Sequence, residues 1–341
     1  MTAVATAPPL ALRPVRWRRL AWVTWRRYRF TLAAVLGVLG VVALDLVISG
    51  NHVRSAYDAL RACRPTDSEK CRYLDDAFHN TYGSSGFLGP VLILLPGIVG
   101  AFGGAPLLAR ELETGTFRYA WTQGAGRMRW AVALLVPSAL VLVLLMVGLG
   151  TLISWHDHPT IVEGMRQRLD PGTFPTTGLA IAGWTLLGFA LGAFAGLLWR
   201  RVLPALGSAF AVWFGLAYLT ASRLRFHYEA PLRSTSMELP RSAASVGQWW
   251  TKDGARVSDA TINQILESSG AQISGRQMKV HVVPGAIDPI QDLLNRGYLQ
   301  VTQYQPDARF WTFQWIEFGW LAALSVILLG ATFWLLRKRA A

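Results

Sequence analysis

Six stretches of this sequence are apolar over about the length that a helix needs to cross a lipid bilayer. A helix that spans roughly 30 Å of hydrocarbon needs about 20 predominantly apolar residues. The first stretch contains Asp45, the last contains Glu317, and the other four carry no charge. Because a soluble protein would not need six such runs, the pattern predicts an all-α polytopic membrane protein. The six predicted spans are 31–49, 87–108, 131–154, 178–199, 202–222 and 311–336.

The first run follows a basic segment, as the apolar core of a secretory signal peptide does. However, 31–49 is longer than such a core, which has about 7–15 residues. The sequence "DLVISGNHV" at its end offers no A-x-A-like cleavage site. We therefore expect an uncleaved first span, preceded by a disordered tail at 1–13.

Positive charge is concentrated on one side of the predicted spans. Cytoplasmic segments of membrane proteins are rich in Lys and Arg. With both termini placed inside, the inner segments carry 16 basic residues against Glu111 and Glu113, a net charge of +14, and the rest of the chain has a net charge of −1. The net charge of +13 therefore indicates an N-in, C-in topology and not binding to nucleic acid. The inner basic residues are Arg13, Arg16, Arg18, Arg19, Arg26, Arg27, Arg29, Arg110, Arg118, Arg127, Arg129, Arg200, Arg201, Arg337, Lys338 and Arg339.

The two cysteines, Cys63 and Cys71, both fall in 50–86, the first loop on the predicted outer side. Nearby cysteines in an oxidising compartment commonly pair. We expect a disulfide that closes a small loop, with two free thiols as the alternative. A zinc site would need more ligands than this pair supplies.

The largest segment between runs, 223–310, predicts a small α+β extracytoplasmic cap. A hairpin is expected around Asp253-Gly254 in "SVGQWWTKDGARVS". Ser258 is expected to cap a helix through "DATINQILESSG" that Gly270 ends. "MKVHVVPG" indicates a short strand, and "DPIQDLLNRG" indicates a helical turn or two.

Residues 14–30, "PVRWRRLAWVTWRRYRF", combine arginines with aromatic residues just before the first run. This segment predicts an amphipathic helix in the inner interface that leads into the first span. A basic anchor without such a helix is the alternative. The residues that share the less charged face at helical spacing are Trp17, Leu20, Ala21, Thr24, Trp25 and Tyr28.

Glycine and proline recur inside the runs. A four-residue spacing of small residues lets two helices approach closely, either between subunits or within one bundle. The fourth run has this spacing at Gly188, Gly192 and Gly196. Prolines free backbone carbonyls, which then need partners from neighbouring helices or from a water-filled path. The second run contains Pro90, Pro96 and Pro106.

Motifs of catalysis and nucleotide binding are missing from this sequence. It has no G-x-x-x-x-G-K-[ST], no H-E-x-x-H and no G-x-S-x-G. We therefore expect no catalytic residue, no metal and no cofactor in this chain. All six histidines map outside. His156, Asp157 and His158 form an "HDH" sequence that could contact a metal, but we expect a polar loop there.

Asp45 and Glu317 each lie near the predicted outer end of a span. A carboxylate inside a bilayer is costly, so such residues usually serve a function or face a polar cavity. One interpretation is that the two line a translocation path and contact a cationic substrate. The alternative is that they reach the outer interface or form hydrogen bonds between helices.

The segment 109–130, "ARELETGTFRYAWTQGAGRMRW", is a charged interruption between the second and third runs. With the residues before it, it resembles the pattern "GAPL-ARE-E-GT-R---TQ---R-RW" of ABC-2 type permeases, the membrane subunits of type V-like ABC exporters, as found in an actinobacterial group. "TWRRYR", the paired cysteines and "YQPDARFWTFQWIE" resemble the same family. The matching positions are Gly104, Ala105, Pro106, Leu107, Ala109, Arg110, Glu111, Glu113, Gly115, Thr116, Arg118, Thr122, Gln123, Arg127, Arg129 and Trp130.

The resemblance implies a transmembrane exporter subunit in the bacterial plasma membrane. It would pair with a second copy or a homologue and with cytoplasmic ATPase subunits that hold ATP and Mg. Segment 109–130 would couple to the ATPase, where Glu111 and Glu113 can pair with basic groups on the ATPase or on the connecting helix. The coupling residues would be Arg110, Glu111, Glu113, Gly115, Thr116, Arg118, Gln123 and Arg127. The connecting helix at 14–30 would brace this segment through Trp17, Arg19, Trp25 and Arg26.

An apolar interior with few charges indicates an amphiphilic substrate such as a drug, antibiotic, lipid or peptide. Two other functions stay open at this point: a membrane-bound enzyme or sensor, and a secondary transporter. Secondary transporters often have internal repeats, which we do not find here. The expected organisation is a tail at 1–13, a connecting helix at 14–30, spans one to five at 31–222, a cap at 223–310, and span six with a basic tail at 311–341.

Overall fold

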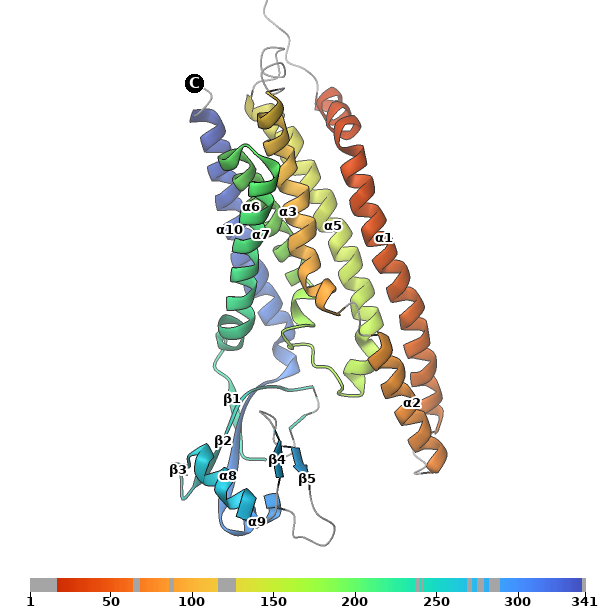
Figure 1. The fold of residues 1–341 in the computed structure, drawn as a ribbon, viewed down its shortest axis with the longest axis vertical. Coiled ribbons are helices and arrows are strands. Elements are labelled where there is room, and N and C mark those ends of the chain that lie inside the picture. Colours follow the sequence, from red (N-terminus) through yellow and green to blue (C-terminus); the bar gives the residue numbers. More distant parts are fainter. Residues whose placement is uncertain are drawn as a thin grey trace, which may run out of the picture. The chain divides into compact units, whose positions relative to one another are not determined.

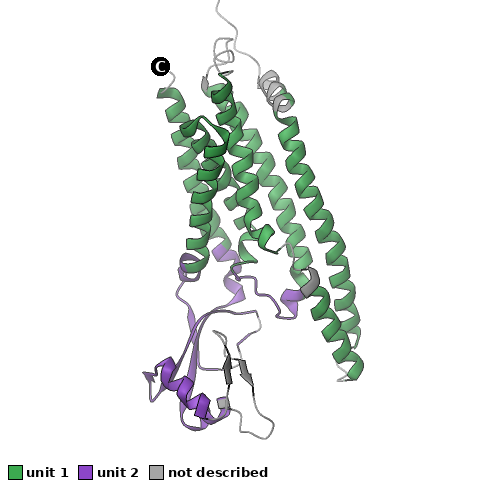
Figure 2. Cartoon of the chain, in the orientation of Figure 1, with its two compact units in different colours: residues 1–159, 171–222, 314–341 green, residues 160–170, 223–313 purple. Residues whose placement is uncertain are grey.

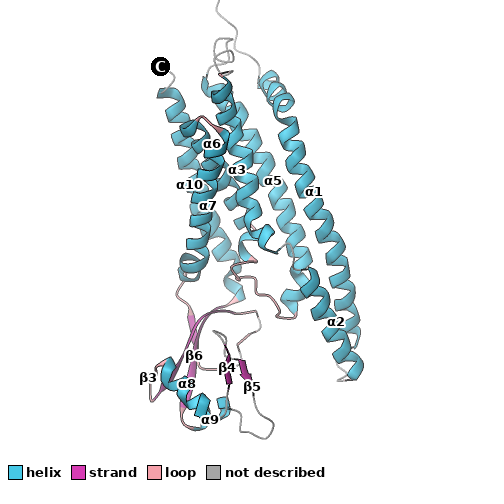
Figure 3. Ribbon diagram, viewed as in Figure 1, coloured by secondary structure: helices cyan, strands magenta, loops and turns pink. Residues whose placement is uncertain are grey.

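The computed structural model describes residues 17–63, 68–85, 89–115, 127–236, 239–240, 242–268, 272–274, 279–281 and 289–338. The chain divides into two compact units (Figure 2). Unit 1 comprises residues 1–159, 171–222 and 314–341, and unit 2 comprises residues 160–170 and 223–313. The described strands all belong to unit 2, whereas the described part of unit 1 is almost entirely helical (Figure 3).

Unit 1 is built from long helices that lie side by side (Figure 1). They are α1 (Trp17–Cys63), α2 (Glu69–Ser85), α3 (Gly89–Thr114), α5 (Arg127–Val162), α6 (Ala180–Trp199), α7 (Val202–Leu219) and α10 (Phe310–Lys338). Within the described residues, six helical segments are long and apolar enough to cross a membrane, and each overlaps one predicted span. The prediction of six helices that are long and apolar enough to span a membrane is therefore confirmed. These segments are Tyr28–Cys63, Gly89–Thr114, Met128–Val162, Ala180–Trp199, Val202–His227 and Asp307–Lys338.

The first helix extends beyond the predicted first span at both ends. It runs without a break over 47 residues, which is about 70 Å at 1.5 Å per residue and about twice the thickness of the hydrocarbon layer. From Trp17 onwards, the predicted connecting helix is the first part of α1 and not a separate element. Its position in the inner interface stays a prediction.

The segment 50–86, which connects the first two predicted spans, is mostly helical in its described part. The last turns of α1 and the helix α2 form a hairpin with a core of its own, because Val53, Leu60 and Phe78 are fully buried. The centre of the Tyr57 ring lies 5.9 Å from the centre of the Phe78 ring. A disulfide between Cys63 and Cys71 joins the two helices at the turn.

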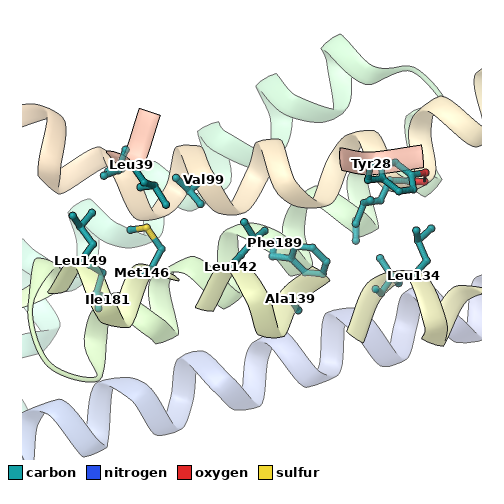
Figure 4. Packing of buried hydrophobic residues seen from close by; sticks show 14 of the residues in the cluster. Tyr28, Leu39, Val99, Leu134, Ala139, Leu142, Met146, Leu149, Ile181 and Phe189 are labelled. Atoms are coloured by element: carbon teal, nitrogen blue, oxygen red, sulfur yellow. Dashed lines mark hydrogen bonds between the residues drawn. The ribbon is translucent and has the colours of Figure 1, made fainter. Parts of the chain in front are cut away.

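The core of unit 1 is formed by side chains from α1, α3, α5, α6 and α10. Figure 4 shows its centre, where Leu142 and Met146 of α5 face Phe189 and Ile181 of α6. Most of α6 is buried, whereas α1, α7 and α10 expose many large apolar side chains. Exposed apolar side chains on spanning helices are suited to contact with lipid tails.

Helices α3 and α6 approach each other through glycines. A Cβ built on Gly192 would lie 2.8 Å from the backbone N of Ala105, and one on Gly196 would lie 2.7 Å from the carbonyl O of Ala105. With Gly188, these two residues form the glycine stripe of α6. A Cβ built on Gly188 would lie 3.2 Å from the carbonyl O of Gly97. The stripe therefore packs within one bundle, and it is not free to form a dimer interface.

Unit 2 contains a four-stranded antiparallel sheet in the order β1-β6-β2-β3 and a separate pair, β4-β5. Helices α8 (Asp259–Ser268) and α9 (Pro289–Asn295) contribute to a small core around Trp250 of the larger sheet. The predicted small α+β region is thus present. Its strands are β1 (Leu232–Ser234), β2 (Ala244–Lys252), β3 (Ala255–Arg256), β4 (Gln272–Ser274), β5 (Lys279–His281) and β6 (Tyr298–Gln305).

Local sequence signals placed most of these elements correctly. Asp253 and Gly254, with φ of 51° and 79°, form the two-residue turn of the β2–β3 hairpin. The Ser258 hydroxyl accepts a hydrogen bond of 3.2 Å from the Thr261 N–H and so caps α8. Gly270 lies outside the described residues. The central strand β6 was not predicted.

Candidate functional site

One end of unit 1 gathers the basic residues that the sequence assigned to the inner side. The start of α1, the end of α3, the start of α5, the α6–α7 connection and the end of α10 all lie at this end (Figure 1). The tertiary structure therefore groups charges that are far apart in the sequence. The described basic residues at this end are Arg26, Arg29, Arg110, Arg129, Arg200, Arg201, Arg337 and Lys338.

A buried polar contact joins α1 to α3 at the same end. The Tyr28 hydroxyl donates a hydrogen bond of 3.1 Å to Oε1 of Glu111 and lies 3.3 Å from the carbonyl O of Leu107. Glu111 is only 2% exposed, because it follows Leu107 and Leu108 on the face of α3 that packs into the core. The contact thus connects the predicted connecting helix to the first turn of the predicted coupling segment.

The two glutamates of that segment have different environments. Glu111 is buried and has Tyr28 of the connecting helix as one of its partners, whereas Glu113 is exposed. Arg110 is exposed as well. Gly115, with φ of 70°, adopts the left-handed conformation that commonly ends a helix. Arg110 and Glu113 are therefore accessible at the end of α3.

Only some of the predicted coupling residues belong to the part of the chain that the structure describes. Thr116, Arg118 and Gln123 lie outside the described residues, as do the side chains of Trp17, Arg19, Trp25 and Arg127. Arg26 is exposed, and its guanidinium lies 5.4 Å from the centre of the Trp22 ring. Contact of these residues with an ATPase stays a prediction.

Glu317 is fully buried on α10 and accepts a hydrogen bond of 2.7 Å from Nε1 of Trp184 on α6. The Trp184 ring packs edge-on against Trp213 and Trp320, and its carbonyl O accepts a 2.9 Å bond from Nε1 of Trp213. Glu317 therefore forms a hydrogen bond between helices, which was the alternative to a role in a translocation path.

Gln314, one turn before Glu317, was missed in the sequence. Its Oε1 accepts a hydrogen bond of 2.7 Å from the Ala180 N–H at the start of α6, and its Nε2 donates to the carbonyl O of Phe174 at 3.3 Å. Gly178, with φ of 59°, leaves room for this side chain. The available signal was the i, i+3 spacing of two polar residues in an apolar run, which places both on one helical face.

Asp45 has a different environment from Glu317. It lies on an exposed face of α1, and its carbonyl O accepts a 2.7 Å hydrogen bond from the Ser49 hydroxyl. The structure thus gives one predicted path carboxylate a buried position between helices and the other an exposed one. It does not bring the two into a shared polar site.

The "HDH" sequence lies in helix α5 and not in a loop, which corrects the prediction. His156 and Asp157 are buried, and Nδ1 of His156 lies 2.8 Å from Oδ1 of Asp157. Arg54 of α1 donates a 2.6 Å hydrogen bond to the carbonyl O of Trp155. Among the described residues, no group of three or more His, Cys, Asp or Glu side chains is placed to hold a metal ion.

A comparison with models of known protein families identifies the family to which this helical bundle belongs. Residues 36–225, more than half of the chain, match the family model described as ABC-2 membrane transporter related. The match includes α3, α5, α6 and α7 and the charged segment 109–130. Comparisons with curated proteins and with solved structures gave no match. With this match and its six membrane-competent helices, the chain belongs to the ABC-2 membrane transporter related family.

Proposed function

We propose that this protein is the transmembrane subunit of an ABC exporter in the bacterial plasma membrane. It moves an amphiphilic substrate, such as a drug, antibiotic, lipid or peptide, out of the cell. A separate cytoplasmic subunit binds ATP and Mg and supplies the energy by hydrolysis. The family and the six apolar helices establish a multi-pass transporter subunit, and the rest is our proposal.

The proposal places the basic end of unit 1 in the cytoplasm, since cytoplasmic loops collect Arg and Lys. The ATPase then docks on segment 109–130, which continues α3 at that end. A second copy of the chain, or a homologue, completes the permease. Exposed Arg110 and Glu113 supply charges that can set the register of docking.

The contact between Tyr28 and Glu111 is the observation that carries this proposal. A permease that is driven by a separate motor needs a stiff path from the docking segment into the bundle. Helix α3 provides one, because it runs from that segment along glycines of α6 with backbone atoms in close contact. The hydrogen bond from Tyr28 to Glu111 links α1 to α3, so that a displacement of α3 would also move α1.

The composition of the spans supports the proposed substrate class. Four of the six predicted runs contain no charged residue, and the two exceptions have one carboxylate each. Glu317, one of these, is already bonded to Trp184 and is fully buried. A path with so few charges favours a molecule with a large apolar part.

The test is to express the full chain with an ABC ATPase from a neighbouring gene of its genome and to measure co-purification and ATP hydrolysis in nanodiscs. We expect a stable complex with substrate-stimulated ATPase activity. Glu113→Ala should weaken the complex, because it removes an exposed docking charge. Tyr28→Phe should leave the complex intact and lower the stimulation, because it removes a hydrogen bond to a buried carboxylate.

Matched controls come from the hairpin of α1 and α2, at the other end of unit 1. Glu69→Ala and Tyr73→Phe change exposed residues of the same types there, and neither should alter the complex or the stimulation. Replacing both Glu111 and Glu113 with Ala should uncouple or dissociate the ATPase. Failure to form a complex, or transport driven by a proton gradient alone, would favour a secondary transporter instead.

A further inference from the structure

One face of the larger sheet in unit 2 carries two arginines on either side of a tryptophan. The guanidinium carbon of Arg233 on β1 lies 5.9 Å from the centre of the Trp249 ring, and that of Arg256 on β3 lies 5.4 Å from it. The register explains this grouping. Trp249 is paired with Val301, Arg233 with Gln303 and Arg256 with Thr251. Paired residues, and residues two apart on one strand, point to the same face of a sheet, so all three side chains lie on one face.

This face is opposite to the one that α8 and α9 cover. Trp250, the next residue along β2, is buried against Ile262 and Leu266 of α8, so Trp249 points away from that core. Arg233 and Arg256 are both exposed. Leu299, which is paired with Thr251 on the same face, is 51% exposed. The uncovered face therefore combines basic, aromatic and aliphatic side chains.

Among the described residues, the two arginines have no counter-charge. In the part of the chain that the structure describes, neither guanidinium is paired with a carboxylate, whereas Arg296 and Arg309 of the same unit are paired with Asp292 and Glu229. Because both guanidinium groups lie close to one ring, each adds to the positive potential at the other. A planar guanidinium matches a phosphate with two parallel hydrogen bonds. An anion that contacts both guanidinium groups would balance their charge, and a phosphate has the matching geometry.

Chain connectivity limits how far one end of this face can lie from two membrane-competent segments. Arg233 lies six residues after His227, where one membrane-competent segment ends, and Gln303 lies four residues before Asp307, where another begins. Four residues span at most about 14 Å even when extended. Headgroups occupy a layer of roughly 5–8 Å on each side of the hydrocarbon. Bilayer phosphates are therefore within reach of at least one end of this face.

We infer that Arg233, Trp249 and Arg256 form a site for the phosphate groups of anionic phospholipids at the membrane surface beside unit 2. Tryptophan and basic residues are typical of such interfaces, and exposed Leu299 suits the apolar part of a lipid. The inference does not depend on the ATPase, so it can fail or hold independently of the proposed export function.

The test uses the full-length protein in neutral detergent, titrated with phosphatidylglycerol or phosphatidylcholine and followed by native mass spectrometry. A basic residue near an anionic surface contributes about fivefold in affinity. Phosphatidylglycerol should therefore bind about 25-fold more weakly at this site in the Arg233→Gln/Arg256→Gln variant. The Arg233→Lys/Arg256→Lys variant keeps both charges but not the planar guanidinium groups, so its affinity for phosphatidylglycerol should lie between those of the unchanged protein and the Arg233→Gln/Arg256→Gln variant.

The matched control is Lys252→Gln/Arg296→Gln, which removes the same charge from unit 2 away from this face and should bind phosphatidylglycerol like the unchanged protein. Equal lipid binding by the control and by the Arg233→Gln/Arg256→Gln variant would overturn the inference. Displacement of the lipid by millimolar inorganic phosphate or by polyglutamate would also overturn it, because the site would then be for a free anion or an acidic protein.

Discussion

Gly100→Ala is the substitution that tests the packing of α3 against α6 most directly. A Cβ at Gly100 would lie 2.5 Å from the carbonyl O of Thr185, 2.7 Å from the N of Phe189 and 2.9 Å from the carbonyl C of Gly188. All three are backbone atoms of α6, so no side chain can rotate away. The two helices must move apart, and the close contact along the glycine stripe is lost.

The expected change in the free energy of unfolding results from two opposing effects. Overpacking a tight core usually costs about 1–3 kcal/mol. Replacing glycine by alanine inside a helix gains about 0.5–1 kcal/mol. Gly148 of α5 provides the control, because a Cβ there would have nothing within 4 Å. Since both variants gain the same helical preference, their difference isolates the steric cost, which we expect to be about 1–3 kcal/mol.

The assay is reversible unfolding of each variant in mixed micelles of increasing SDS content, monitored by circular dichroism. Gly100→Ala should unfold at a lower SDS fraction than the unchanged protein, and Gly148→Ala at an equal or higher one. If the two variants agreed within about 0.5 kcal/mol, α3 and α6 would not be in backbone contact at Gly100, and the proposed stiff path into the bundle would lose its basis.

Two further predictions concern other parts of unit 1. Cys63→Ser/Cys71→Ser opens a disulfide with a sequence separation of 8, which should cost about 2–3 kcal/mol of local stability, measured as faster hydrogen exchange in α2 with unchanged exchange in α6. Exchange rates in α2 that did not change would show that the buried contacts of Phe78 hold the hairpin alone. Trp184→Phe removes the donor to the buried Glu317 carboxylate and should lower the free energy of unfolding by about 1.5–3 kcal/mol, measured by SDS titration. Trp199→Phe, at an exposed indole that donates to Ser208, should change it far less, and equal losses in both variants would contradict the argument.

The sequence alone determined the elements whose signal is local. Each membrane-competent helix follows from one apolar run, because hydrocarbon demands that every backbone group be bonded within its own segment. The turn at Asp253 and Gly254 and the cap at Ser258 were also readable, since both depend on the conformational preferences of a few adjacent residues. The charged segment and the family were recognisable on the same basis, as a short pattern at fixed spacing.

The tertiary structure decided everything that depends on which faces meet. The sequence did not show that Glu111 points inward to Tyr28 while Glu113 points outward, or that Glu317 is bonded to Trp184. Nor did it show that α1 continues past Gly50, because the buried partner that stabilises this extension, Phe78, lies on another helix. Strand β6 was missed for the same reason. Its eight residues become a central strand only through pairing with β1 and β2, which lie about fifty residues or more earlier in the chain.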